Sequence, residues 1–230
     1  MTNGEFHVYV RNLQTGTTKL VSADMENNGS GEAGLAIPTI SADGRYIAFD
    51  SQDDSYVPND SNQAYDVFVR DIVADTTELI SQSYPPLRPL TANNLSSVSA
   101  NSISADNRFV AFVSIGNNLV ANDTNGYQDV LVRDLQGGTN ILVSVNAAGT
   151  ATASGFSGSP VISGDGRHVV FVSNAGDLVA NDTNRTDDIF VRDLQIRTTM
   201  LISVSTNGNT SGNGASSAPM ISTDGRFVAF

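Results

Sequence analysis

The sequence has no cysteine, no tryptophan and only two histidines among its 230 residues. Without cysteine, disulfides, thiol catalysis and zinc–thiolate sites are all excluded. Without tryptophan, its ring is not available as a platform on which a sugar could stack. His7 and His168 are too few for a histidine-rich metal centre. These absences remove several classes of catalytic and metal site at the outset.

Positive charge and long apolar runs are scarce as well. Twelve Lys and Arg residues stand against 24 Asp and Glu, which gives a formal net charge of -12, and Lys19 is the only lysine. Such a charge repels nucleic acids and anionic lipid surfaces, so we expect no nucleic-acid partner. No run approaches the 18 or more apolar residues of a membrane span, so we expect no membrane insertion.

The chain instead contains a repeat that recurs four times. Arg11, Arg70, Arg133 and Arg192 each lie in a Val-Arg-[Asp/Asn]-[Leu/Ile] tetrad, 59, 63 and 59 residues apart. A second series ends an Ile-Ser-x-Asp-[Gly/Asn]-Arg hexad and falls at Arg45, Arg108, Arg167 and Arg226. Self-similarity at a fixed period indicates a repeat architecture, in which one unit cannot bury its apolar surface alone.

Each unit carries four short strand signals. The first is Pro-x-Ile-Ser, which is followed by an Asp-Gly pair that favours a tight hairpin. The second follows the hexad arginine, the third precedes the tetrad arginine, and the fourth reads Thr-Thr-x-Leu-[Ile/Val]-Ser. The second and third signals have apolar residues at consecutive positions, so we expect both faces of each sheet to be covered.

A small antiparallel sheet buried on both faces and repeated with Gly- and Asp-rich turns is typical of a propeller blade. We therefore predict an all-β fold, a β-propeller of four-stranded antiparallel blades with about 60 residues per repeat. Residues 1–230 are expected to form a single propeller domain. Its blades are predicted at about 37–81, 101–144 and 160–203, with a composite fourth blade made of 219–230 and 7–22.

These motifs resemble those of a known family. The hexad with the strand that follows it, and Asn-Asp-[Thr/Ser]-Asn leading to Asp-Val-Phe-Val-Arg-Asp-Leu, are similar to the TolB-type propeller repeat, and the resemblance covers nearly the whole chain. Propellers of this type occur in bacterial cell-surface and secreted proteins, as binding scaffolds, as companions of peptidase domains and as pectin lyases. The resemblance implies a periplasmic, cell-surface or secreted location.

The number of blades in the ring is open. The chain starts with strands three and four of a blade and ends with strands one and two, so its ends could close a ring of four. Four is the lower limit of the usual blade number. A segment of a larger ring, or a homodimer in which two chains share one eight-bladed ring, is the alternative.

The loop between strands two and three is the candidate metal site. It carries acidic and amide side chains at positions 1, 3 and 7, a set of oxygens that suits calcium. These candidate ligands are Asp60, Asn62, Asp66, Asp123, Asn125, Asp129, Asp182, Asn184 and Asp188. The alternative is that Asp and Asn cap turns through their own backbone. The first copy has Met1 and His7 at the acidic positions, so we expect no calcium there.

The second inter-blade loop differs from the others and is the candidate partner-binding site. It is four residues longer and contains three of the seven prolines within residues 84–90. Tyr84, Leu87 and Arg88 would present aromatic, apolar and cationic groups on a rigid loop. A tolerated insertion would give the same sequence.

We find no catalytic constellation in the sequence. His168 aligns with Tyr46, Phe109 and Phe227, which indicates a packing residue. The Gly155–Gly158 segment lacks the spacing of a nucleophile elbow. We therefore expect a non-enzymatic binding or scaffold propeller, a segment of a larger extracytoplasmic protein that presents its loops to a protein or glycan partner. The alternative is the propeller part of a hydrolase or lyase whose catalytic residues lie outside this segment.

Overall fold

The computed structural model describes residues 6–29, 37–58, 60–84, 91–208 and 210–230. Within these ranges the chain forms strands, turns and loops, and it contains no helix that could span a bilayer. In chain order the strands are β1 (Tyr9–Arg11), β2 (Thr18–Leu20), β3 (Thr39–Ile40), β4 (Tyr46–Ser51), β5 (Asp66–Asp71), β6 (Thr76–Leu79), β7 (Ser96–Ile103), β8 (Phe109–Ser114), β9 (Asp129–Asp134), β10 (Thr139–Leu142), β11 (Ser157–Ile162), β12 (His168–Ser173), β13 (Asp188–Asp193), β14 (Thr198–Leu201), β15 (Met220–Ile221) and β16 (Val228–Ala229).

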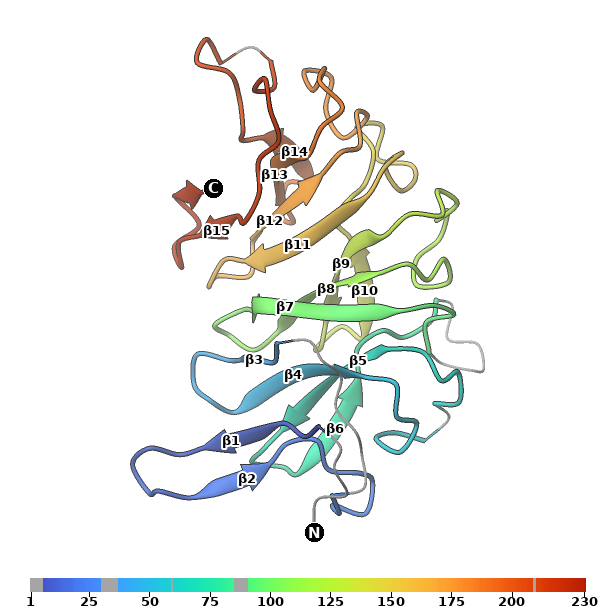
Figure 1. Ribbon diagram of the computed structural model, residues 1–230, viewed down its shortest axis with the longest axis vertical. Coiled ribbons are helices and arrows are strands. Elements are labelled where there is room, and N and C mark those ends of the chain that lie inside the picture. Colours follow the sequence, from blue (N-terminus) through green and yellow to red (C-terminus); the bar gives the residue numbers. More distant parts are fainter. Residues whose placement is uncertain (1–5, 30–36, 59, 85–90, 209) are drawn as a thin grey trace.

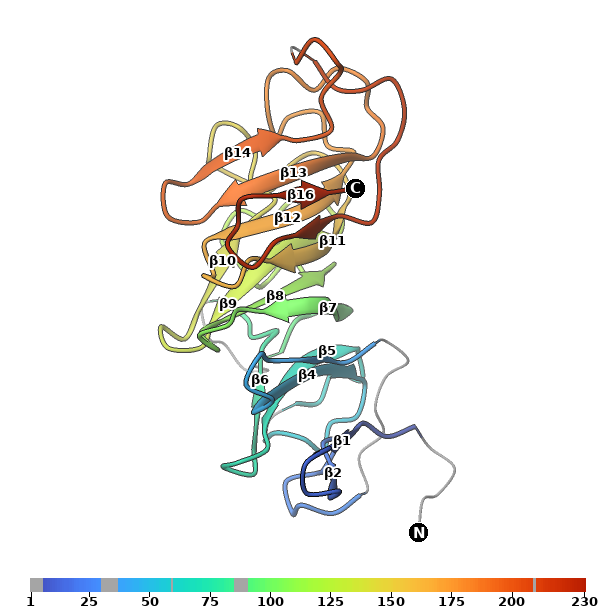
Figure 2. The ribbon, with the colours of Figure 1, turned by 90° about the vertical axis from the view of Figure 1, so that its left-hand side faces the viewer.

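The strands form three four-stranded antiparallel sheets, β3–β6, β7–β10 and β11–β14, in which neighbours in sequence are neighbours in space. Two hairpins, β1–β2 and β15–β16, make separate two-stranded sheets. Figures 1 and 2 show the sheets following one another along the long axis of the molecule. The first strands of successive sheets lie side by side, β3 with β7, β7 with β11 and β11 with β15. The predicted all-β propeller of four-stranded antiparallel blades is confirmed.

The hexad forms a turn that satisfies its own polar groups. The Ser41 hydroxyl donates to Asp43 Oδ1 at 2.6 Å and accepts from the Tyr46 N–H at 2.9 Å, while Asp43 Oδ1 also accepts the Arg45 N–H at 3.0 Å. The residue after the aspartate has a positive φ, 73° at Gly44 and 60° at Asn107. Glycine and asparagine tolerate this conformation best, which explains why this position admits both.

The hexad arginine pairs with the tetrad aspartate of the same sheet, which connects strand two to strand three. Arg45 Nη2 donates to Asp71 Oδ2 at 2.6 Å, and Arg108 Nη2 to Asp134 Oδ2 at 2.7 Å. The same aspartate caps the following turn, because Asp71 Oδ1 accepts the N–H groups of residues 73 and 74. In the first repeat Asn12 keeps the cap, accepting the N–H groups of residues 14 and 15, but carries no charge.

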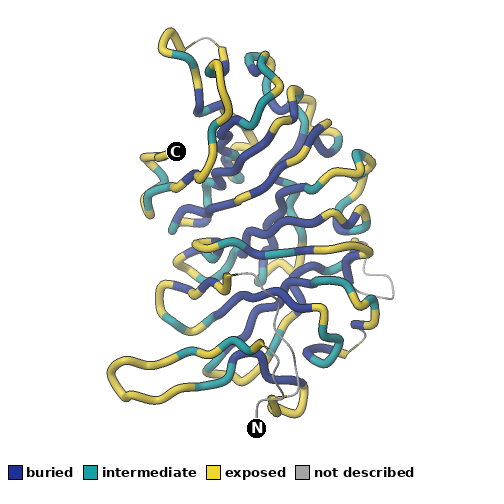
Figure 3. The backbone as a smooth tube through the Cα atoms, viewed as in Figure 1, coloured by how far each residue is buried: buried dark blue, intermediate teal, exposed yellow. Residues whose placement is uncertain are grey.

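The apolar core lies between successive sheets. Val110 and Phe112 belong to the cluster shared with the preceding sheet, whereas Ala111 and Val113 belong to the cluster shared with the next one. Consecutive residues of one strand therefore point into two different interfaces, as the unbroken apolar runs predicted. Figure 3 shows buried residues concentrated in the middle of the sheets and exposed ones at the hairpin tips.

The composite fourth blade is not formed in this structure. Residues 219–230 and 7–22 contribute separate two-stranded sheets, and the described parts of these sheets do not pair with each other. Figure 1 shows the β1–β2 hairpin at one end of the molecule and β15 beside the third four-stranded sheet, toward the other end. The full sheets span residues 39–79, 96–142 and 157–201, compared with the predicted 37–81, 101–144 and 160–203.

Candidate functional site

The calcium-ligand candidates all lie at one end of the sheets. Strand two ends and strand three begins at this end, and the segments that lead to the next sheet also start there. We call this end the loop face, and the opposite end, which carries the Asp-Gly turns and the turns between strands three and four, the turn face.

An asparagine in each loop connects it to the next inter-sheet segment. Asn125 Nδ2 donates to Asp129 Oδ2 at 3.0 Å and to the Ala153 carbonyl at 2.8 Å, while its Oδ1 accepts the Tyr127 N–H at 2.8 Å. Asn62 makes the equivalent bonds, donating to Asp66 Oδ2 at 2.8 Å and to the Ala92 carbonyl at 2.7 Å. The asparagine thus presents its amide nitrogen, not its oxygen, to the neighbouring carboxylate.

Asn184 follows the same plan only in part. Its Nδ2 donates to the Gly212 carbonyl at 2.8 Å and its Oδ1 accepts the Thr186 N–H at 2.9 Å. The second oxygen of Asp188 has no hydrogen-bond partner in the described part of the chain.

The aspartate that starts strand three is buried in every full sheet. The side chain of each accepts a hydrogen bond from the strand-four serine, from Ser81 to Asp66 Oδ1, from Ser144 to Asp129 Oδ1 at 2.7 Å and from Ser203 to Asp188 Oδ1. Burial raises the pKa of Asp66 to about 6 and that of Asp129 to about 7. Each serine also accepts a backbone N–H of strand three. The aspartate and the serine together therefore link the start of strand three to the end of strand four.

The first full sheet holds the densest group of acids. Burial raises the pKa of Asp60 to about 7, and the charges of Asp66 and Asp54 add to the effect. Asp60 Oδ1 and Thr91 Oγ1 are buried without a hydrogen-bond partner among the residues that the structure describes. Burial also raises the pKa of Asp123 and Asp182, the equivalent residues of the other two sheets.

The loops bring oxygens together without forming an evident metal cage. Within the described ranges, no group of three or more His, Cys, Asp and Glu side chains is arranged to hold a metal ion. Asp60, Asp182 and Asp188 each have a buried oxygen without a hydrogen-bond partner among the described residues, but Asn62, Asn125 and Asn184 use their side-chain oxygens in turns. The arrangement serves as a turn and inter-sheet clamp, and calcium binding stays a prediction.

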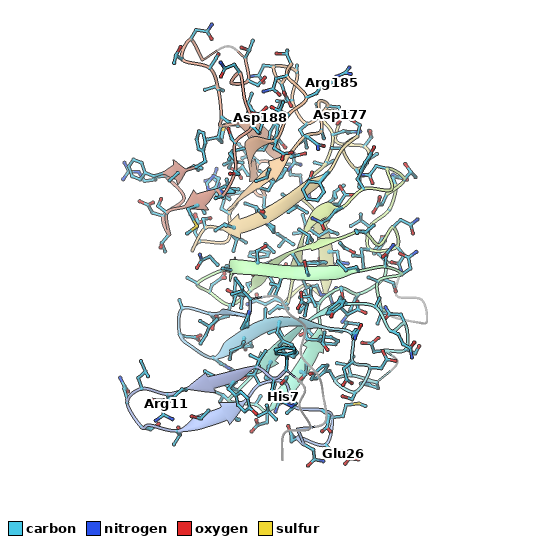
Figure 4. All side chains as sticks on the ribbon, in the orientation of Figure 1. His7, Arg11, Glu26, Asp177, Arg185 and Asp188 are labelled. Atoms are coloured by element: carbon cyan, nitrogen blue, oxygen red, sulfur yellow. The ribbon has the colours of Figure 1, made fainter. Side chains whose placement is uncertain are left out.

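The first repeat replaces the buried aspartate with histidine. His7 Nδ1 lies 3.4 Å from Ser22 Oγ, and Ser22 is the fully buried strand-four serine of this repeat. His7 and Asp188, at equivalent positions of the repeat, lie toward opposite ends of the molecule in Figure 4. Ser22 also accepts the Val8 N–H, as Ser81 and Ser144 accept the equivalent N–H groups, so the His7–Ser22 contact corresponds to the aspartate–serine contact of the full sheets.

The other histidine lies on strand two of the third sheet. His168 Nε2 lies 3.4 Å from Asp193 Oδ2, the carboxylate that Arg167 Nη2 approaches at 2.7 Å. The His168 side chain is 20% exposed and packs beside Gly225 of the β15–β16 turn. This position agrees with the packing role predicted for it.

The partner-binding candidates are described in part. Tyr84 is 56% exposed on the loop face, and its N–H donates to the Asn118 carbonyl at 2.6 Å. Leu87 and Arg88 lie outside the described residues.

Other exposed apolar residues of the loop face were not predicted. Tyr127 and Phe156 are 51% and 39% exposed, and Leu95 and Ile115 are 36% and 38% exposed. All four lie next to the ends of strands at this face. Comparing the repeats could have found Tyr127, because Ala64 and Thr186 occupy its position in the other two sheets.

Comparison with known proteins supports the fold. No family model and no curated protein match the chain. Among solved structures, TolB from Acinetobacter baumannii aligns with 96% of this chain and 47% of its own length, at 15% identity and a TM-score of 0.53. An oligogalacturonate lyase in complex with manganese aligns with 95% of this chain and 51% of its own length, at 14% identity and a TM-score of 0.56. The tricorn protease aligns with 83% of this chain and 16% of its own length, at 15% identity and a TM-score of 0.50.

The chain thus spans 47% of the TolB structure and 51% of the lyase structure. A fold shared with a lyase and a protease as well as with TolB does not by itself define an activity. At identities of 14 to 15% the likeness concerns architecture alone. This chain has a TolB-like β-propeller fold.

Proposed function

We propose that this chain is a non-catalytic binding propeller that presents its loop face to a protein or glycan partner. It would act as a segment of a larger extracytoplasmic protein, in the periplasm, at the cell surface or secreted. The observation that supports this proposal is the set of exposed aromatic and aliphatic side chains, Tyr84, Tyr127, Phe156, Leu95 and Ile115, on one face of a repeated scaffold. Aromatic side chains are enriched in binding interfaces, where they add contact area at low conformational cost.

A protein is the better fit of the two partner classes. Leu95 and Ile115 are aliphatic and lie on the same face as the rings of Tyr127 and Phe156. Aliphatic side chains contribute to protein interfaces through buried apolar area. A glycan site would depend on the aromatic rings and on polar groups.

Calcium would have a supporting role in this proposal. The buried acids of the loops, such as Asp60 and Asp66, lie beneath the same face. A cation that neutralised them would hold the loops in one conformation before the partner binds.

The proposal can be tested by substitution on the two faces of the propeller. Binders obtained from a glycan array and a displayed peptide library would be measured by biolayer interferometry. The double variant Tyr127→Asp with Phe156→Asp should weaken binding by about tenfold or more, as expected when two interface aromatics are lost.

The matched control is on the turn face. Val73 and Ile196 are 72% and 61% exposed in the turns between strands three and four, and Val73→Asp with Ile196→Asp should leave the affinity unchanged. A binder that is lost with the control pair and kept with the loop-face pair would contradict the proposal.

A hydrolase or lyase propeller is the second candidate. The fold is compatible with it, since an oligogalacturonate lyase and the tricorn protease share this architecture. In that case the catalytic residues would lie outside this segment. Turnover of oligogalacturonate or of peptide esters by the purified chain itself would contradict both this candidate and the binding proposal, because both assign no catalysis to these residues.

A further inference from the structure

The tetrad arginine reaches from strand three toward the preceding sheet. Arg70 Nη2 donates to Asn27 Oδ1 at 2.6 Å and to Asp75 Oδ1 at 3.1 Å. Arg133 Nη2 donates to Gln82 Oε1 at 2.9 Å, and Glu78 Oε1 lies 3.8 Å away. In both cases an amide oxygen and a carboxylate compensate a guanidinium that is almost completely buried.

In the third full sheet these acceptors have been replaced. The acceptors for the third sheet would come from the second repeat. There, Ile141 occupies the position that Glu78 has in the first repeat, and Val145 occupies the position of Gln82. In the third full sheet, Arg197 occupies the repeat position that Asp75 occupies in the first full sheet. Among the described residues, the Arg192 side chain keeps only the hydrogen bond from its Nη1 to Thr199 Oγ1, at 3.0 Å.

A cavity occupies the place of the missing acceptors. It has a volume of about 370 Å³ and lies between β10 and the segment after it on one side and the β13–β14 hairpin on the other. Arg192 and Arg197 line it, together with Ile141, Leu142, Val145 and Leu194. Asn140 and Gly149 complete the lining, so two arginines share this cavity with four aliphatic side chains and one amide.

No acid pairs directly with the two arginines of this cavity among the described residues, and only the charge of the neighbouring Asp193 acts favourably on Arg192. Neither Arg192 nor Arg197 forms an ion pair in the part of the chain that the structure describes, although acids outnumber bases two to one in the sequence. Asp193, next in sequence, is already paired with Arg167. Burial and the like charge of Arg197 both lower the pKa of Arg192, a repulsion that a bound anion would relieve.

We propose that this cavity binds a carboxylate carried on a small apolar group. A planar carboxylate can accept two parallel hydrogen bonds from one guanidinium while a second guanidinium adds charge. The aliphatic walls would hold the hydrocarbon part of the ligand. The net charge of -12 disfavours polyanions, so the ligand carries a single charge. This proposal does not depend on the proposed function.

The probe for the test is 4-methylpentanoate, titrated into the 15N-labelled chain and followed by NMR. We expect saturable shift changes confined to residues 140–149 and 192–199. Arg197→Gln, a change at an exposed position, should weaken the affinity about tenfold, as expected for one charge-assisted hydrogen bond. Ile141→Glu restores the acid that the preceding sheet has at Glu78, and it should abolish binding and raise Tm.

Control variants and control ligands decide the result. Arg185, another exposed arginine, lies in a loop-face loop (Figure 4), and Arg185→Gln should leave the affinity unchanged. The uncharged 4-methylpentanamide should not bind, and equal binding of the amide would overturn the proposal. Comparing 4-methylpentanoate with N-acetyl-leucine distinguishes a free acid from a peptide C-terminus as the source of the carboxylate. The amide of N-acetyl-leucine is the uncharged control. Equal binding of inorganic phosphate would overturn the role of the apolar group, and shifts that persist with Ile141→Glu would overturn the site.

Discussion

The aspartates of the repeat differ in the direction of their pKa shifts according to what surrounds each carboxylate. The Arg167 guanidinium lowers the pKa of Asp193 to about 2, and two turn N–H groups add to this effect. Among the residues that the structure describes, no arginine forms an ion pair with Asp60 or Asp129 at the loop face, and burial raises the pKa of each to about 7. The motifs predict where these acids lie, but burial is produced by the neighbouring sheet and cannot be read from the local sequence.

The asparagine clamp shows the same limit. The sequence identifies Asn62 and Asn125 as loop residues with oxygens suited to turns or to calcium. It does not reveal that the amide nitrogen of Asn125 reaches the carbonyl of Ala153, 28 residues further along the chain. Only the packing of successive sheets brings these two groups together.

These pKa shifts predict that the chain is more stable at pH 5 than at pH 8. An aspartate whose pKa is higher in the folded state than its ordinary 3.8 binds its proton more tightly there. The free energy of unfolding therefore falls as the pH rises from about 4 to about 7. Below this window stability falls again, because Asp71 and Asp193, whose pKa values are lowered, lose their ion pairs. Thermal unfolding across this pH range checks the prediction, and a Tm that rises steadily toward pH 8 would contradict it.

The variant Asp60→Asn separates the two interpretations of the loops. Its amide would remove a buried charge and place a donor near Asp66, so in chelator Tm at pH 8 should rise by at least about 2 °C. If calcium binds, millimolar calcium should raise the wild-type Tm more at pH 8 than at pH 5, because calcium requires ionised carboxylates. Asp60→Asn would then abolish this calcium effect, whereas Glu26→Gln at an exposed position would not. An unchanged wild-type Tm would assign the loops to turn capping.

At the scale of the strand, consecutive apolar residues were the most informative signal. They predicted correctly that strands two and three are covered on both faces, as β4, β5, β8 and β9 are. The start of β7 was predicted less well, because it begins at Ser96 and its pairing with β8 is interrupted between Val98 and Ile103. The segment Ser96–Asn101 is mostly polar, so it carries no apolar pattern that could have announced a strand.

The repeat offers a matched pair of phenylalanines for measuring what sheet packing contributes. Phe171 and Phe230 occupy the same repeat position, but Phe171 is fully buried against Phe190 while Phe230 is 57% exposed. Phe171→Ala should lower the free energy of unfolding by about 3–5 kcal/mol, the cost of emptying a core position. Phe230→Ala should change it by less than about 0.5 kcal/mol. Urea denaturation measures both, and equal losses would mean that another surface covers Phe230 in solution.

At the scale of the whole molecule, each interface between sheets has its own apolar cluster. Four clusters follow one another from the β1–β2 hairpin to the β15–β16 hairpin. The repeat period predicts this succession, because each unit needs a neighbour on both sides. It cannot predict how the series closes, since ring size depends on small rotations between blades that no single motif encodes.

Sharing of one ring by two copies is a specific geometric prediction. In the first full sheet β4 pairs with β5 so that Ala48 lies opposite Val69. Transferred by the repeat, this register places Ala229 of one copy opposite Val10 of the other. The pairing would cover Phe230 and Tyr9, which are 57% and 53% exposed in the isolated chain.

Because the chain has no native cysteine, this register can be tested by disulfide trapping. The single variants Ala229→Cys and Val10→Cys, mixed and oxidised, should form a covalent heterodimer, since opposed antiparallel residues lie within the Cα separation that a disulfide requires. Arg11→Cys mixed with Ala229→Cys, one residue out of register, should cross-link far less. Light scattering should give twice the 24.2 kDa of one chain. A chain that carries both Ala229→Cys and Val10→Cys but closes its disulfide within a monomer would instead indicate a ring of four blades, and a monomer without any disulfide would contradict both forms of closure.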